Sequence, residues 1–192
     1  IFEVEGQDYG EEEDRPGARE GIVTPGYFQT FQTEILQGRA FLVSDRAGAI
    51  PVCVVNETFA RNFLDGDALG RRLRKRPPNT EFLGAESEWL TVVGVVPDMR
   101  MEGIGNNNAS PAGFYIPIGQ SDVGNTVVIA LRTQSAPMSK TPEVRSAVTS
   151  IDPNLPIFQV LDMEGVIARQ TFFYTVFGKL FMAFGFAALF LA

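Results

Sequence analysis

The stretch LFMAFGFAALFLA, from Leu180 to Ala192, carries no charged side chain. In a helix that rises about 1.5 Å per residue it covers about 20 Å, whereas crossing a bilayer core takes about 20 residues. The run reaches the end of the chain without a polar flank, so we expect a piece of a longer membrane protein. A buried helix of a soluble protein is the alternative. It is disfavoured because phenylalanines occur all round the helix and leave no polar face.

The apolar stretch continues a helix that we expect to begin at Met163 and to enter the membrane. Only glycines interrupt the pattern after Met163, and membrane helices tolerate glycine. Aromatic rings and a lysine that can snorkel precede the run and would lie near the membrane surface: Phe172, Phe173, Tyr174, Phe177 and Lys179. The alternative role for these rings is packing against the preceding domain. We predict a truncated membrane helix over residues 163–192.

The composition narrows the classes of function. The chain has 192 residues, of which 45% are hydrophobic and 20% charged, enough for one sizeable core or two small lobes. A formal net charge of −7 argues against nucleic acid as a partner. The absence of histidine removes the commonest general base and the commonest metal ligand. Cys53 has no second cysteine to pair with and lies in an apolar run, so we interpret it as a small core residue.

Strand–helix units precede and follow a β-rich middle. The first unit has a strand at 18–23, with Thr24 as the N-cap of a helix that Gly38 ends. The second has a strand at 51–55, Asn56 as the N-cap of a helix, and Gly66 closing it. The third has a strand at 126–132, a helix that Thr141 caps and residues 152–153 end, and a strand at 157–161. In the middle, strands are predicted at 69–75, 89–96 and 114–118, with loops at 76–88 and 101–113.

Few motifs carry chemistry. No phosphate-binding loop and no Cys/His cluster with metal-ligand spacing is present in the sequence. The adjacent pair Ser139-Lys140 could in principle form a nucleophile and base, but it lies in a polar loop. The carboxylate pairs Asp65/Asp67 and Glu86/Glu88 are interpreted as solvated surface charge. The site prediction is therefore no catalytic residue, no cofactor and no metal.

Two further patterns leave alternatives open. Arg71–Arg76 holds five basic residues in six on an acidic chain. Such a cluster can contact anionic headgroups or an acidic partner, or it can protect a solvated edge strand from aggregation. Asn56 and Asn108 begin Asn-x-Ser/Thr glycosylation patterns. Asn56 is expected to cap a helix and to stay unmodified.

Several phrases, in order, resemble the periplasmic core domain of MacB-like ABC transporter permeases, the FtsX-related group, and most of all the acidobacterial-type duplicated permeases. The phrases cover most of the chain from about Ile22 and leave out the acidic residues 1–17. They are TPGYF (Thr24–Phe28), LQGRAF (Leu36–Phe41), VVNETFAR (Val54–Arg61), LGR (Leu69–Arg71), TVVGVVPD (Thr91–Asp98), YIP (Tyr115–Pro117) and IDP (Ile151–Pro153).

The resemblance implies an α+β, two-lobed extracytoplasmic domain that lies between two membrane helices of a bacterial inner-membrane permease. Residues 1–65 and 126–162 would form a porter-like βαβ lobe, and residues 66–125 an inserted β-rich lobe. The implied function is mechanotransmission, in which ATP hydrolysis moves the membrane helices and these move the outer domain during export. The implied partners are a cytoplasmic ATPase subunit or domain, a second permease copy (a homodimer or an internal repeat), a periplasmic adaptor and the membrane, with no nucleic acid.

Two other hypotheses compete with this one. A membrane-tethered sensory or ligand-binding module would need an enclosed pocket of several hundred Å³ with convergent polar groups. An extracytoplasmic enzyme would need an unexpected buried carboxylate pair in a cleft, because histidine is absent. The sequence favours a non-enzymatic permease domain and does not reveal the transported substrate.

Overall fold

The computed structural model describes residues 1–10, 15–76, 87–101, 111–124 and 126–191 of the chain. The chain divides into two compact units, each described by itself. The first comprises Ile1–Met101 and Ala109–Leu131, and the second Glu102–Asn108 and Arg132–Ala192. In chain order the elements are β1 (Phe2–Val4), β2 (Arg19–Val23), α1 (Tyr27–Thr30), β3 (Gln37–Gly38), β4 (Val52–Asn56), α2 (Glu57–Phe63), β5 (Arg72–Lys75), β6 (Leu90–Val96), β7 (Gly113–Pro117), the 3₁₀ turns η3 (Ile118–Gln120) and η4 (Pro137–Lys140), α3 (Thr141–Ile151) and α4 (Met163–Leu191).

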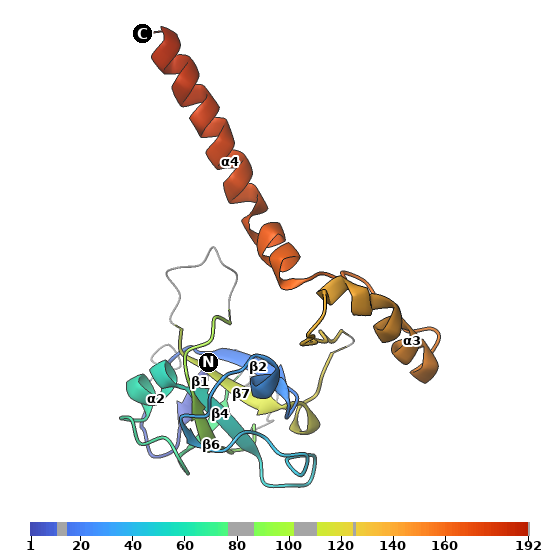
Figure 1. Ribbon diagram of the computed structural model, residues 1–192. Coiled ribbons are helices and arrows are strands. Elements are labelled where there is room, and N and C mark those ends of the chain that lie inside the picture. The colour runs from blue at the N-terminus through green and yellow to red at the C-terminus, as the bar shows by residue number, and fades with distance from the viewer. Residues whose placement is uncertain (11–14, 77–86, 102–110, 125, 192) are drawn as a thin grey trace. The chain divides into compact units, whose positions relative to one another are not determined.

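The first unit is built on a mixed sheet of seven strands in the order β1-β5-β6-β4-β7-β2, with β3 added to β6 (Figure 1). β4 pairs parallel with β6 and antiparallel with β7, while β2 pairs parallel with β7. β1 and β5 continue the sheet beyond β6 in antiparallel pairs. The sheet with its helices confirms the α+β class.

The central strand β4 is buried along its whole length, so its alternating side chains contribute to two cores. Cys53 and Val55 belong to a core that includes Phe59 of α2, whereas Val52 and Val54 belong to a second core that includes Phe28 of α1. This explains why the strand reads as a continuous apolar run instead of an alternating one. Cys53 is fully buried, as predicted for a core residue.

The second strand–helix unit matches its prediction. The Asn56 side chain accepts a hydrogen bond from the Phe59 amide at 3.0 Å and so caps α2. Gly66, at φ 79°, follows the helix and donates to the Ala60 carbonyl, which closes it. The strands predicted at 18–23, 69–75, 89–96 and 114–118 are present as β2, β5, β6 and β7, with shifted ends.

The first helix is much shorter than predicted. Instead of reaching Gly38, α1 ends at Thr30, and its N-cap is Gly26 without a side-chain bond, not Thr24. Gln32 adopts φ 54°, a left-handed conformation that a helix cannot continue through. The chain then pairs with β6, beginning with the Leu36 amide on the Val95 carbonyl at 2.8 Å. Pairing with the sheet thus replaces the second half of the expected helix.

Three predictions in the third unit are wrong. In the described part of the chain, 126–132 and 157–161 contain no strand, because no neighbouring strand pairs with them. Apolar side chains such as Val128 and Phe158 are exposed there. The helix between them is present as α3, but its N-cap is Lys140 and not Thr141. Asp152 ends it in an extended conformation, as predicted.

The sheet contains strands from both of the expected lobes. Residues 66–125 are the predicted inserted lobe, and β5, β6 and β7 from this range share one sheet with β2 and β4 from residues 1–65. The pairing of β4 with both β6 and β7 joins the two ranges. Residues 132–162 fall in the second unit with α4.

Candidate functional site

A buried carboxylate lies on β1, at one edge of the sheet. Glu3 is only 7% exposed, and three guanidinium groups surround it. Arg74 donates to one carboxylate oxygen at 2.7 Å, while Arg15 and Arg76 donate to the other at 2.8 and 3.1 Å. Burial alone would raise the pKa of Glu3, but the hydrogen bonds from the three arginines outweigh it and hold the pKa below its ordinary value.

Most basic side chains of the cluster Arg71–Arg76 form ion pairs with acidic residues of the same domain. Besides the two arginines at Glu3, Arg72 forms an ion pair with Glu5, and Lys75 one with Glu20 at 2.7 Å. The guanidinium of Arg74 also stacks over the Trp89 ring, 4.6 Å from its centre. The suggested protection of an edge strand is wrong, because β5 lies between β1 and β6. Acidic N-terminal residues and basic β5 residues compensate one another.

A second buried carboxylate shapes the loop between β3 and β4. Asp45 is 8% exposed and receives two hydrogen bonds from the Arg39 guanidinium, at 2.7 and 3.1 Å. The Leu42 amide donates to the same carboxylate at 2.8 Å. Burial raises the pKa of Asp45, but the hydrogen bonds from Arg39 and Leu42 lower it by more. The pKa of Asp45 therefore lies below its ordinary value. This fork fixes the start of the loop.

Gln120 of η3 holds the other end of that loop. Its side-chain oxygen accepts from the Val52 amide at 3.0 Å, and its amide nitrogen donates to the Ile50 carbonyl at 2.9 Å. Between the two anchors the loop displays apolar side chains to solvent, with Val43 84% and Ile50 75% exposed. Hydrogen bonds to Asp45 and Gln120 therefore fasten both ends of a loop that lies at the surface.

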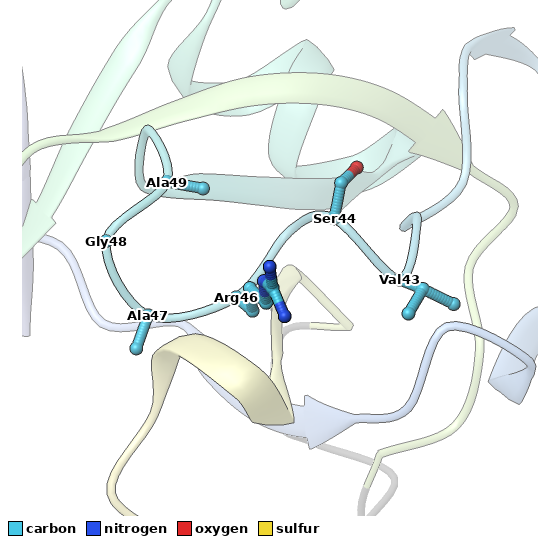
Figure 2. Close-up of a pocket in the computed structure, with 6 residues that line it drawn as sticks. All are labelled: Val43, Ser44, Arg46, Ala47, Gly48 and Ala49. Carbon is cyan, nitrogen blue, oxygen red and sulfur yellow. The ribbon is translucent and has the colours of Figure 1, made fainter.

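Two hollows border this loop. The larger, about 560 Å³, is shown in Figure 2 and is lined by loop residues that are all exposed: Val43, Ser44, Arg46, Ala47, Gly48 and Ala49. The other, about 400 Å³, adds Glu88, Gln120 and Asp122 to the lining. Neither has the enclosed, convergent polar lining that a small-molecule site requires.

Asn56 connects three segments of the first unit. Its side-chain oxygen accepts from the amides of Phe59 at 3.0 Å and Gly113 at 2.9 Å, and its nitrogen donates to the Pro111 carbonyl at 2.6 Å. The side chain is fully buried. A glycosyltransferase could not reach it in the folded domain, in agreement with the expectation that it stays unmodified. The other acceptor pattern, at Asn108, lies outside the described residues.

The remaining candidates are engaged elsewhere or exposed. Ser139 donates to the Ala136 carbonyl at 2.6 Å, and Lys140 pairs with Glu143 at 2.9 Å. Asp65 and Asp67 are exposed on the turn after α2. Of the other carboxylate pair, Glu88 is exposed and Glu86 lies outside the described residues. Within the described ranges, no group of three or more acidic, cysteine or histidine residues could hold a metal ion.

α4 is the one described helix that is long and apolar enough to cross a membrane, over Met163–Phe190 (Figure 1). None of its most apolar window is buried. Phe172, Phe173, Tyr174 and Phe177 are all more than half exposed. By its length and composition, this helix could span a membrane.

Sequence reasoning missed both buried carboxylates, Glu3 and Asp45. The signal for Glu3 was available, since an acidic N-terminus and a basic strand occur in one small domain. The two ends of that ion cluster are separated by more than sixty residues, and only the register of β1 on β5 brings them together. No comparable signal marked Asp45.

Comparison with known proteins gives a consistent result. The family profile of the MacB-like periplasmic core domain matches residues 2–151, so the match begins earlier than Ile22. Among solved structures, the periplasmic region of MacB from Actinobacillus actinomycetemcomitans aligns with a TM-score of 0.52 and 16% identity, covering 79% of this chain. The chain spans 62% of that region. This likeness shows the fold.

Two weaker matches are a domain of a putative permease protein from Porphyromonas gingivalis and the extracellular domain of the noncanonic ABC-type transporter YknZ from Gram-positive bacteria. The first has a TM-score of 0.44 and 20% identity over 88% of this chain and 76% of that one. The second has a TM-score of 0.34 and 18% identity over 52% of this chain and 42% of that one. A search of curated proteins found no match.

Proposed function

Since the chain belongs to the MacB-like periplasmic core domains, we propose that it is the extracytoplasmic domain of a MacB/FtsX-like ABC transporter permease in a bacterial inner membrane. One observation carries the proposal. The family match over residues 2–151 is followed, after a short connection, by the exposed apolar helix α4. A folded domain next to a helix that fits lipid is the arrangement expected of a domain anchored outside the membrane.

The proposed action is mechanical. ATP hydrolysis by a cytoplasmic subunit or domain would move the membrane helices, and a continuous helix such as α4 can transmit displacement along its length. The outer domain would then change its engagement with substrate or with a periplasmic adaptor, next to a second permease copy. Transmission of this kind requires two discrete arrangements that the helix movement favours differently.

The alternative, a membrane-tethered sensory or ligand-binding module, has less support. It calls for an enclosed pocket, whereas the residues lining the larger hollow at the β3–β4 loop are exposed. An exposed loop held at both ends by Asp45 and Gln120 is better suited to contact with another protein than to enclosing a small molecule.

Membrane partitioning tests the anchoring half of the proposal. The full chain is mixed with phospholipid vesicles and floated in a density gradient, beside a variant that carries Phe184→Lys and Leu189→Lys in α4. A lysine inside the hydrocarbon region disfavours insertion, by about 3 kcal/mol at the centre of a membrane helix and by less towards its ends, so the variant with two lysines should leave the vesicle fraction. A matched control is Ile151→Lys, at a side chain 82% exposed on α3, which should float like the wild type. Equal flotation of all three would refute the anchor.

A labelling rate tests the coupling half. A cysteine placed at the exposed Val43 is labelled with a maleimide in membrane vesicles that contain the complete transporter, with and without ATP. The proposal expects hydrolysis of ATP to change the labelling rate, and a non-hydrolysable analogue not to sustain the change. A rate that is the same in all conditions speaks against mechanotransmission, even if the anchor is confirmed.

A further inference from the structure

β1 is short, but the protein holds it on both sides. The strand comprises only Phe2–Val4 and pairs antiparallel with β5. Just beyond the strand, the Glu5 amide donates to the Arg72 carbonyl at 2.9 Å. On the other side, the Val4 amide donates to the Tyr9 hydroxyl and the Phe2 amide to the Pro16 carbonyl, both at 3.2 Å. A free edge strand would leave these amides to water.

The two faces of β1 are held by different forces. Phe2 is fully buried, with its ring 4.7 Å from that of Phe59 and 5.0 Å from that of Phe63. The apolar contact does not depend on charge. Glu3 points to the opposite face, because side chains alternate along a strand. There its carboxylate meets the arginines described above.

The carboxylate of Glu3 is the shared counter-ion of three arginines. The charged groups that face it among the described residues are Arg15 from the loop after β1, Arg74 of β5 and Arg76 just after β5. Neutralising Glu3 removes the attraction for all three guanidinium groups at once. Half-buried cations that lose a shared counter-ion repel one another and draw water in, and this favours separation of β1 from β5.

We propose that β1 is a detachable strand and that the charge of Glu3 keeps it closed on β5. With Glu3 neutral, residues 1–5 open from the sheet more often as a local unit, while β4, β6 and β7 stay paired. On the proposed function, residue 1 would follow a membrane helix, and movement of that helix would pull on this strand first. The strand is then the point at which force enters the sheet.

Acid offers a second way to neutralise the same group. The pKa of Glu3 lies below its ordinary value of 4.5, so the folded strand is favoured fully above pH 4.5. That contribution is lost as the pH falls through the lower, folded-state value. Opening of β1 is therefore expected in the acid range and not near neutrality.

Hydrogen exchange in the full chain, held in non-ionic detergent, tests the proposal. Glu3→Gln keeps the shape of the side chain and removes its charge. At pH 7 we expect the amides of Val4 and Glu5 to exchange at least about tenfold faster than in the wild type, a factor in keeping with the loss of a half-buried ion cluster. Amides of Val54 and Val55, in β4, should change by less than about twofold if the opening is local.

Control variants distinguish a role of Glu3 in holding β1 from a role in the stability of the whole sheet. Glu34→Gln removes an exposed carboxylate and should leave both regions unchanged. If Glu3→Gln does not fold, exchange is measured instead in Arg15→Gln and Arg76→Gln, each of which removes one arginine from the cluster. These variants should also accelerate exchange in β1 more than in β4. Unchanged exchange in β1, or equal acceleration of β1 and β4, would overturn the proposal. Exchange in the isolated chain does not depend on transport, so this failure is distinct from failure of the proposed function.

Discussion

Replacement of Asn56 by alanine tests how the first unit is joined together. Loss of the N-cap on the Phe59 amide costs about 1 kcal/mol. The change also leaves the Gly113 amide and the Pro111 carbonyl without their partner in a buried position, at about 1 to 3 kcal/mol for each group. Because Asn56 is fully buried, water cannot replace these bonds unless the surrounding structure rearranges. These terms together predict that Asn56→Ala lowers the free energy of unfolding by about 3 to 7 kcal/mol.

The assay is urea unfolding of the full chain in non-ionic detergent, followed by the fluorescence of Trp89, the single tryptophan. Asn62→Ala is the matched control, because Asn62 lies in the same helix with an exposed side chain and should change stability by less than about 0.5 kcal/mol. Asn56→Asp keeps the two accepted bonds but loses the donor to Pro111 and buries a charge, so it should also destabilise. A loss below about 1 kcal/mol for Asn56→Ala would show that the three-segment bridge does not hold the unit together.

Three further predictions concern other parts of the first unit. Asp45→Asn should lower stability near pH 7, because Asp45 stabilises the fold only when it is ionised. The difference in stability from the wild type should shrink as the pH falls below about 3.8, the ordinary pKa of the group. A difference in thermal unfolding that does not depend on pH would contradict the ion pair with Arg39. Gly94→Ala should weaken the β3–β6 pairing, since a Cβ there would collide with the Arg39 carbonyl, and an unfolding midpoint equal to that of the wild type would refute the close approach. Cys53 should resist thiol reagents in the folded chain and react only on unfolding, because burial raises its pKa and excludes the reagent; rapid labelling without denaturant would count against the β4 core.

Local signals made the second strand–helix unit predictable. An apolar run, a capping asparagine and a closing glycine act within sixteen residues, so Asn56 and Gly66 could be assigned without knowledge of the fold. The same holds for α4, whose length and composition are properties of the segment alone. The helix after Thr24 was mispredicted because its periodicity competes with pairing of residues 37–38 on β6. That competition depends on a strand more than fifty residues away.

The candidate site depended on contacts that are distant in the sequence. Glu3 and Arg74 meet only through the register of β1 on β5, and Val52 meets Gln120 only through the η3 turn. The opposite charges of the N-terminus and residues 71–76 indicated an electrostatic role for the basic cluster. They did not reveal that its acidic partners lie in the same domain. The strands predicted at 126–132 and 157–161 had the right composition, yet a strand also needs a neighbour.

On the proposed function, this chain is a domain outside the cytoplasm that is held by a membrane helix. Its most direct test is labelling of intact bacterial cells that express the full chain within its permease, using a maleimide that does not cross the inner membrane but reaches the periplasm. The native chain is its own control, because Cys53 is fully buried. A cysteine at Val43 should be labelled in intact cells to the same extent as in lysed cells. Labelling only after lysis would place the domain in the cytoplasm and refute the proposed location.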